Sequence, residues 1–291
     1  SCWLIDTMAG VLHGNDLEKL HELCTKPFKE QAVWFLNGFW HDMGEKEAEN
    51  VWNQVELCVE LNDKDASGSQ LDEMKAHRFL ERLKDTHTVL ELRAQLRKVK
   101  AIGESERPKN VPYAHYLVFR YECDWHRLVN AAQGDNAEEI AKAQQQVKEA
   151  QESCEKAQKA ANQAALAQME LEKALAEVKS QEAARDEKTR ILTEKSETGG
   201  VVSRNKAKNE LSQHLAEDPL PLRKAKITLE AAVKKAEKAT KAAEEARAKA
   251  EADLAEAEAY LKELSSKGGS GQGAIWWMER ELTEARKFMP V

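Results

Sequence analysis

Residues 139–160 read EIAKAQQQVKEAQESCEKAQKA, and they belong to a run over 135–198 that contains neither glycine nor proline. A second run of this kind covers residues 222–267. Both are built mainly from Ala, Glu, Lys and Gln, which are strong helix formers. The two runs predict two long helices and an all-α fold.

Small apolar residues recur every seven positions along both runs. In the first run one seam position holds Ile140, Val147, Cys154, Ala161, Gln168 and Leu175, and the other holds Ala143, Ala150, Ala157, Ala164, Leu171 and Val178. In the second run one position holds Leu222, Leu229, Ala236, Ala243, Ala250, Ala257 and Leu264, and the other holds Ala225, Ala232, Ala239, Ala246, Asp253 and Tyr260. A seam sustained over so many heptads indicates a coiled coil.

The connection between the two runs decides how the helices pair. It starts at Gly199-Gly200 and ends at Pro219-Leu220-Pro221. Glycine and proline mark turns, so we expect an intramolecular antiparallel hairpin over 135–267 with its tip at 199–221. Parallel pairing of two chains is the alternative, and the break would interrupt it. Within the tip we expect a short helix over 203–215 with Ser203 as its N-cap.

Aromatic residues are almost absent from the hairpin. The seven Trp lie at 3, 34, 40, 52, 125, 276 and 277. A core needs aromatic bulk, so we expect a helical domain over 1–132, a flexible linker over 268–273 and a terminal helix over 274–289 that packs on the first domain. The residues expected to anchor this helix are Ile275, Trp276, Trp277, Met278 and Leu282.

The N-terminal domain is expected to contain helices near 16–42, 45–61, 74–100 and 113–132, without strands. Its first interhelical loop resembles a calcium-binding EF-hand loop, with candidate ligands Asp63, Asp65 and Ser67 before Gly68. Calcium loops end in a bidentate Glu at position 12. Here Met74 falls at that position and Glu73 is out of register, so a solvated polar turn is the favoured interpretation.

The second loop fits calcium less well. Counting back from the helix after it, Glu104 takes position 1, Glu106 position 3 and His115 position 12. Pro108 and Lys109 fall at positions 5 and 6, where a calcium loop has an oxygen ligand and a glycine. The sequence therefore predicts a degenerate, EF-hand-like pair of loops with no cofactor, calcium included.

Composition and motifs exclude several classes of function. The net charge of −7 argues against a nucleic-acid-binding protein as a whole, and no apolar stretch is long enough to span a membrane. No nucleophile elbow, phosphate-binding glycine loop or pair of catalytic carboxylates is present. We therefore expect a protein that is not an enzyme.

One region has the opposite charge to the rest. Lys and Arg outnumber Asp and Glu between residues 200 and 241. A solvated helix face is one interpretation; a contact surface for an acidic partner is the other. The candidate contact residues are Arg204, Lys206, Lys208, Arg223, Lys224, Lys226, Lys234 and Lys235.

Three stretches resemble the calcium-regulated actin-bundling proteins of slime moulds: PFKEQAVWFLN at 27–37, YLVFRY at 116–121 and GAIWWMEREL at 273–282. The resemblance implies an EF-hand domain joined to a helical hairpin, actin cross-linking as the activity and inhibition by calcium. It also implies an actin contact near the tip and the start of the second long helix.

The sequence thus predicts a cytoplasmic, cytoskeletal protein that binds and bundles filamentous actin without calcium control. Its other partners are expected to include neither nucleic acid nor membrane, and self-association is left open. The alternative is a structural rod that spaces some assembly other than actin.

Overall fold

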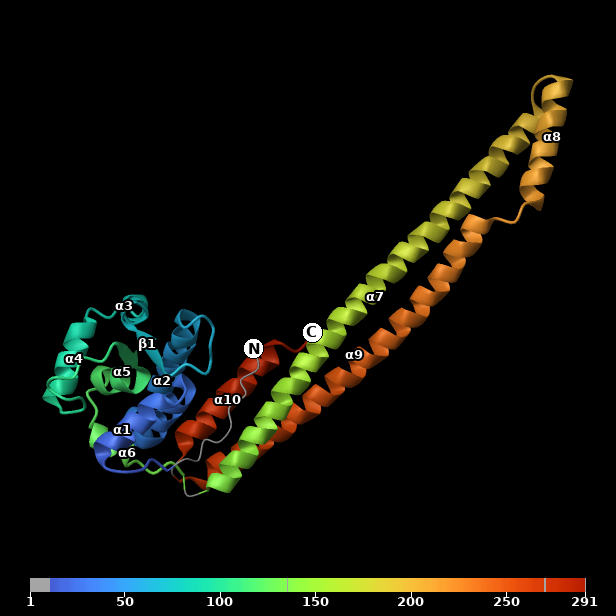
Figure 1. The fold of residues 1–291 in the computed structure, drawn as a ribbon. Helices are drawn as coiled ribbons and strands as arrows, with labels where there is room; N and C mark the ends of the chain where they lie inside the picture. Colours follow the sequence, from blue (N-terminus) through green and yellow to red (C-terminus); the bar gives the residue numbers. More distant parts are fainter. Residues whose placement is uncertain (1–10, 135, 270, 291) are drawn as a thin grey trace. The chain divides into compact units, whose positions relative to one another are not determined.

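The protein is represented by a computed structural model, which describes residues 11–134, 136–269 and 271–290. Within these ranges it is almost entirely helical, with one pair of three-residue strands (Figure 1). The predicted all-α class is confirmed. Trp3 and the first ten residues of the predicted N-terminal domain lie outside the described residues. No helix in the described ranges is both long and apolar enough to cross a bilayer.

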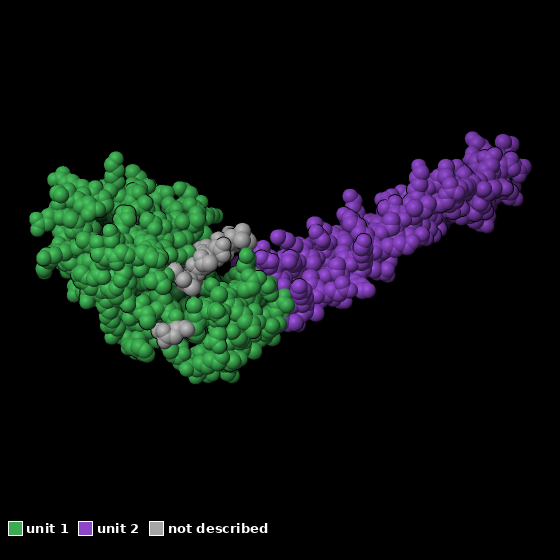
Figure 2. Space-filling view, turned by 60° about the horizontal axis from the view of Figure 1, so that its bottom comes forward, with its two compact units in different colours: residues 1–151, 253–287 green, residues 152–252, 288–291 purple. Residues whose placement is uncertain are grey.

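The chain divides into two compact units, green and purple in Figure 2. Unit 1 holds the described residues up to Gln151 together with Asp253–Lys287, and unit 2 holds Glu152–Ala252 with the few residues after Lys287. The first turns of the outgoing long helix and the last turns of the returning one therefore group with the N-terminal part. The predicted division at residues 132–135 lies earlier in the chain.

Unit 1 contains most of the short elements. Its helices and strands are α1 (Asp16–Thr25), α2 (Phe28–Leu61), β1 (Gln70–Asp72), α3 (Glu73–Arg82), α4 (Val89–Lys98), β2 (Asn110–Pro112), α5 (Tyr113–Arg120), α6 (Trp125–Val129) and α10 (Gln272–Lys287). The two long helices α7 (Ala137–Glu197) and α9 (Leu220–Lys267) pass through both units, and α8 (Val201–Ala216) lies in unit 2.

Three of the four predicted N-terminal helices are interrupted. The first breaks between α1 and α2, where Pro27 has no N–H for a continuous helix. The third breaks before α4, whose first turn is capped by Thr88 in a capping box with Glu91. The fourth breaks before α6, where Asp124 accepts a hydrogen bond from the His126 N–H. Local caps thus compete with helix continuation at each point.

A small antiparallel sheet joins the two interhelical loops of unit 1. β1 pairs with β2 so that Leu71 lies opposite Val111, and both of these side chains are buried. The expectation of a strand-free domain was wrong, because strands of three residues are too short to leave a period-2 pattern in the sequence.

The buried side chain of Gln31, on α2, ties both loops to the core. Its Nε2 donates to the Ser69 carbonyl at 2.7 Å, and its Oε1 accepts from the Ala114 N–H at 2.6 Å. Ser69 precedes β1 and Ala114 lies in α5, so a single amide links α2 to both helix–loop–helix halves. Removing either partner would leave a buried polar group unsatisfied.

The terminal helix α10 packs along α2. At Gly273 the two backbones approach so closely that an added Cβ would lie 2.6 Å from the Leu36 Cβ and 2.7 Å from the Asn37 nitrogen. The Asn37 Oδ1 accepts from the Ala274 N–H at 2.9 Å. Further along, Trp277 packs on Trp52 with ring centroids 4.7 Å apart. Of the five predicted anchor residues, Trp276 alone is partly exposed, and the other four are buried.

The long helices α7 and α9 run antiparallel in each unit. In unit 2, Glu170 pairs with Lys235 at 2.5 Å and Glu182 with Lys226 at 3.0 Å, so residue numbers rise on one helix as they fall on the other. The same holds in unit 1, where Glu139 pairs with Lys267 at 2.9 Å. An intramolecular antiparallel hairpin is therefore the arrangement in the structure.

The predicted seam of α7 holds at first and then shifts by one residue. Gln168 and Leu175 are exposed, and Ala167 and Ala174 are buried in their place. The drift of an undistorted helix relative to a seven-residue repeat would carry the buried line to the following residue, so the shift to the preceding residue follows from the residue types, with alanine at the inner positions. A polar Gln side chain also has no partner in a seam of alanines.

In α9 one predicted seam line holds and the other moves. Asp253 and Tyr260 are only partly buried, whereas the neighbouring Leu254 and Leu261 are buried. Taking a charged carboxylate out of water costs far more than burying a leucine returns, and the leucines therefore take the inner positions.

The turn of the hairpin lies at the start of the predicted tip, and α8 is the short helix of that tip. The turn is made by Gly199, at φ 95°, and Gly200. Gly200 is the N-cap of α8, and the prediction of Ser203 as N-cap was wrong. Helix α8 then folds back on α7, since the His214 Nε2 lies 3.1 Å from the Thr189 Oγ1. The returning arm therefore consists of α8 and α9 with a break at Glu217–Pro219.

The burial of the two adjacent tryptophans predicts unequal effects on stability. Trp277→Ala should lower the free energy of unfolding by about 3–5 kcal/mol, because it removes a buried ring against Trp52. Trp276→Ala should cost less than half as much, because this side chain is partly in water. Urea denaturation followed by circular dichroism measures both, and equal losses for the two variants would contradict the packing of α10.

Candidate functional site

The four candidate calcium ligands do not converge on one point. Asp65 accepts from both the N–H and the hydroxyl of Ser67, at 3.0 and 2.6 Å, and these bonds lower the pKa of its carboxyl. The Asp63 Oδ2 accepts from Lys75 at 2.9 Å. Glu73 lies at the start of α3, 3.5 Å from Arg93. Among the described residues no group of three or more His, Cys, Asp or Glu is placed to hold a metal ion.

In the second loop the residue predicted at position 12 is a neutral side chain. Burial lowers the pKa of His115 to about 4, an effect that nearby His21 adds to and Glu106 opposes. Glu106 is turned toward its own loop, where it accepts from the Gly103 N–H at 2.9 Å. This loop is therefore closed by hydrogen bonds of its own.

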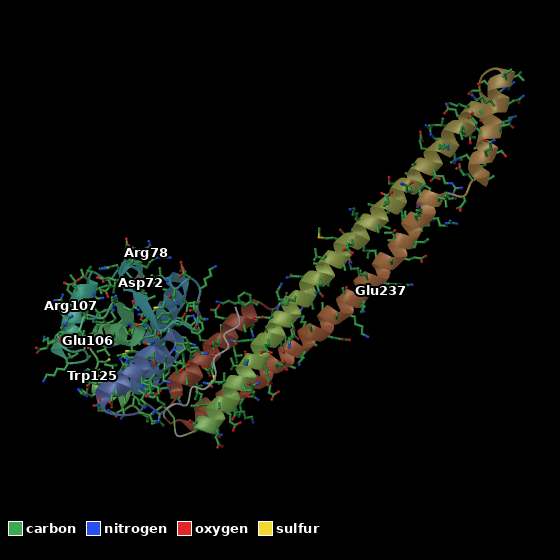
Figure 3. The ribbon with its side chains drawn as sticks, viewed as in Figure 1. Asp72, Arg78, Glu106, Arg107, Trp125 and Glu237 are labelled. Carbon is green, nitrogen blue, oxygen red and sulfur yellow. The ribbon has the colours of Figure 1, made fainter. Side chains whose placement is uncertain are left out.

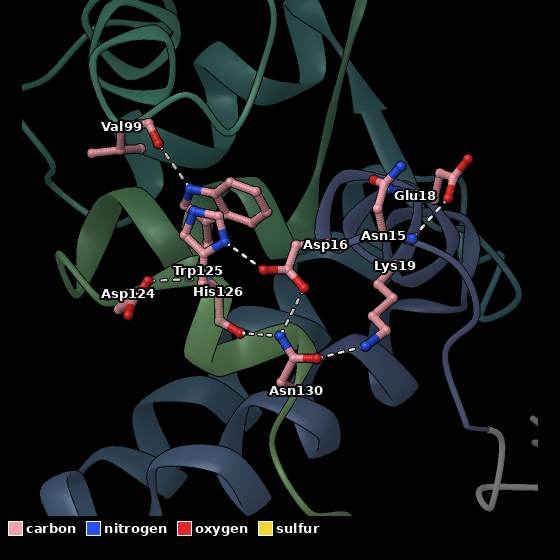
Figure 4. Close-up of polar contacts among 9 residues, drawn as sticks. All are labelled: Asn15, Asp16, Glu18, Lys19, Val99, Asp124, Trp125, His126 and Asn130. Carbon is pink, nitrogen blue, oxygen red and sulfur yellow. Dashed lines mark hydrogen bonds and ion pairs between the residues drawn. The ribbon is translucent and has the colours of Figure 1, made fainter.

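Polar contacts hold α6 against α1 (Figure 4). The His126 Nδ1 lies 2.6 Å from the Asp16 Oδ2, and Asn130 donates to the other oxygen of that carboxylate at 2.8 Å. Lys19 in turn donates to the Asn130 Oδ1 at 2.5 Å. These hydrogen bonds lower the pKa of Asp16. The network accounts for the polar residues here as structural contacts between two helices.

The eight predicted contact cations all lie on the returning arm of unit 2, and all are exposed. They fall into two groups of four. Lys206, Arg223, Lys226 and Lys235 pair with Glu210, Asp218, Glu182 and Glu170. We call the other four the unpaired arm cations, because they have no ion pair within the described part of the chain: Arg204, Lys208, Lys224 and Lys234.

Exposed apolar side chains lie on the same arm, and sequence reasoning missed them. Val201 and Val202 are 65% and 85% exposed at the start of α8, and Ile227 is 60% exposed on α9 beside Lys224 and Lys226. Each lies outside the heptad seam, which is the signal that could have identified it. A protein surface that combines large exposed apolar groups with unpaired charge is suited to contact another macromolecule.

A second group of unpaired cations lies in unit 1 and was also missed. Figure 3 labels two of its members, Arg78 and Arg107. Lys and Arg outnumber Asp and Glu between residues 75 and 109, so a charge count over this region would have found it. The exposed members without an ion pair to any described residue are Arg78, Lys84, Lys98, Lys100, Arg107 and Lys109.

Comparison with known proteins assigns the segment that carries the arm cations. Residues 133–264 match the family model described as F actin bundling C terminal. This segment is similar to the C-terminal domain of F-actin bundling proteins. The resemblance to the actin-bundling family drawn from the sequence is thereby confirmed, and all eight predicted cations lie inside the matched segment.

A solved structure supports the fold of the whole chain. It is the crystal structure of the 34 kDa F-actin bundling protein from Dictyostelium discoideum, which matches with a TM-score of 0.50 and 22% identity over 96% of this chain and 98% of that one. At this identity the match shows a shared fold. A search of curated proteins found no match.

The low pKa of His115 predicts a loss of stability in mild acid. Its pKa is about 4 in the folded protein against an ordinary value of 6.5, so the unfolded chain takes up the proton first as the pH falls. Stability should therefore decrease between about pH 6.5 and pH 4. The melting temperature should depend less on pH across this range in His115→Gln. The exposed control His41→Gln should keep the pH dependence of the wild type. Parallel curves for the two variants would contradict the burial of His115.

Proposed function

We propose that this protein binds actin filaments through the returning arm of its bundling domain and cross-links them into bundles. The observation that carries the proposal is the group of unpaired arm cations on a segment that matches an F-actin bundling domain. A paired cation is already compensated by its own carboxylate. An unpaired one keeps its full charge for an incoming acidic surface.

The arm differs in charge from the protein as a whole. The chain carries a net charge of −7, which would repel an acidic filament at long range. At physiological salt the Debye length is about 8 Å, so a filament responds to the local charge of the surface it meets. The basic arm can therefore bind an acidic filament although the protein is acidic.

Exposed apolar groups on the arm supply the rest of the contact. Ile227 lies within one helical turn of Lys224, so the two side chains share a face of α9. Charges steer the encounter and fix the orientation, and buried apolar area adds affinity that salt does not screen. We expect added salt to weaken binding without abolishing it.

Cross-linking needs a second contact, which we place on the basic group of unit 1. Its cations at the end of α4 and in the following loop, Lys98, Lys100, Arg107 and Lys109, are exposed. The Arg97 Nη2 donates to the Glu106 carbonyl at 2.7 Å and so fixes this loop against α4. One contact in each unit allows one molecule to reach two filaments.

The protein acts as a structural cross-linker on the cytoplasmic actin cytoskeleton, and we propose no catalytic role for it. Calcium control is not expected, because the carboxylates of the first loop are directed to Ser67, Lys75 and Arg93. In the second loop, Pro108 and Lys109 occupy positions that a calcium loop gives to an oxygen ligand and a glycine.

The arm contact can be tested with two variants that remove the same charge from the same helices. One replaces the four unpaired arm cations with Gln, and the other replaces Lys206, Arg223, Lys226 and Lys235 with Gln. High-speed co-sedimentation with filamentous actin should show about tenfold weaker binding for the first, since four exposed charges are each worth a fraction of a kcal/mol. The second should lose less than threefold.

Circular dichroism of both variants serves as the control for folding. Equal losses in the two variants would mean that net charge alone decides binding. Wild-type binding in both would remove the arm from the mechanism and favour a spacer for some other assembly.

The second contact predicts that bundling and binding can be separated. Replacing Lys98, Lys100, Arg107 and Lys109 with Gln should leave high-speed co-sedimentation within about twofold of wild type, because the arm is intact. Low-speed pelleting, which collects bundles, should fall several-fold. Unchanged low-speed pelleting would place the second contact elsewhere.

A further inference from the structure

The side chain of Lys75 reaches from α3 back into the loop that follows α2. Its Nζ lies 2.9 Å from the Asp63 Oδ2 and 3.4 Å from the Asn62 Oδ1. The lysine side chain is 25% exposed, and the Asp63 side chain is 89% exposed. One ammonium group therefore bridges two oxygens on the far side of the loop, where α2 ends.

The strand pair identifies which residue of the other loop corresponds to Lys75. Leu71 of β1 lies opposite Val111 of β2. Lys75 follows Leu71 by four residues, and His115 follows Val111 by four. The spacing of the second loop placed His115 at position 12, so Lys75 occupies the equivalent position in the first loop. The assignment of Met74 to that position was wrong by one residue, because the first loop contains one residue more.

The charge at this position decides what the loop can hold. In a calcium loop a bidentate Glu at position 12 contributes a negative charge and two oxygens to the ion. Lysine contributes a positive charge and no acceptor. Its ammonium donates hydrogen bonds to loop oxygens. A bound cation would coordinate oxygens of the same kind.

The other loop contacts are consistent with a loop that is closed from within. The Lys64 N–H donates to the Val59 carbonyl at 2.9 Å, and the Asp65 N–H donates to the Asn62 carbonyl at 3.0 Å. The Gly68 carbonyl accepts from the Phe28 N–H at 2.8 Å, which ties the loop to the start of α2. Each of these amides can report on whether the loop opens.

We propose that the loop over Asn62–Gly68 is a cation site that the protein fills with its own Lys75 ammonium. The loop is then closed at every calcium concentration, and its conformation does not depend on a diffusible ion. This inference concerns the loop alone and does not rest on actin binding. Its tests contain no actin, so their outcome is independent of the proposed function.

Amide hydrogen exchange of the full-length protein tests the role of the ammonium. Lys75→Met should speed exchange at Asp65 and Phe28 about fivefold, near the upper size expected for an ion pair whose carboxylate is exposed. Lys64→Met is the matched control, because Lys64 is an exposed lysine of the same loop without an ion pair to the described residues. It should change exchange less than twofold. Equal effects of the two substitutions would overturn the proposal.

Calcium chloride at about 1 mM tests whether the site is one for cations. It should leave loop exchange in the wild type unchanged. In Lys75→Glu, which restores a carboxylate at the equivalent of position 12, it should slow exchange several-fold. Calcium protection of the wild-type loop would overturn the proposal, and so would an absence of protection in Lys75→Glu.

Discussion

The close approach of α10 and α2 at Gly273 is the contact on which the rest of unit 1 depends. The last helix of the chain covers one of its first, so two stretches more than 200 residues apart in sequence form one core. An alanine Cβ at this position would meet backbone, which cannot move aside as a flexible side chain can. The glycine is therefore required by packing at this position, although the same residue type marks turns elsewhere in the chain.

Polar contacts make the same helix pair specific. Lys29 and Glu281 form an ion pair at 2.6 Å with both side chains largely buried. Such a pair adds little net stability over an apolar pair. Removing one of the two side chains, however, leaves the other charge buried without a counter-charge. The ion pair therefore selects one register of α10 on α2. The apolar contact of Trp277 with Trp52 supplies most of the free energy, while the ion pair fixes the register of α10 on α2.

The helical hairpin in unit 2 is stabilised differently. Its seam is made mostly of alanine, which buries little area per residue, and its interhelical ion pairs are exposed and worth a fraction of a kcal/mol each. Helix propensity therefore supplies much of the stability. This leaves the outward positions free to carry any side chain that keeps the helix intact, including charges.

The sequence identified the features that are properties of long segments. The absence of Gly and Pro over 135–198 was enough to predict α7, and the missing aromatics were enough to exclude a globular core there. It did not identify features that depend on the tertiary contacts of single residues. The shift of the seam from Gln168 to Ala167 depends on which side chain packs against the facing helix, and the strands at Leu71 and Val111 are too short for periodicity. Whether a given lysine finds a carboxylate depends on the facing helix, so Lys224 and Lys226 could not be told apart.

Whether a cation is paired within the molecule depends on the spacing of the residues around it. Lys75 lies on a short helix with loop oxygens in reach, and its charge is used within the molecule. Arg204 and Lys208 lie four residues apart on α8, so like charges face each other along one side of the helix, an arrangement that destabilises a helix by a few tenths of a kcal/mol. Lys234 and Lys238 repeat this spacing on α9. An acidic surface laid along these helices would relieve the repulsion. An arm bound in this way would be more stable than a free one, which would couple its stability to the proposed filament binding.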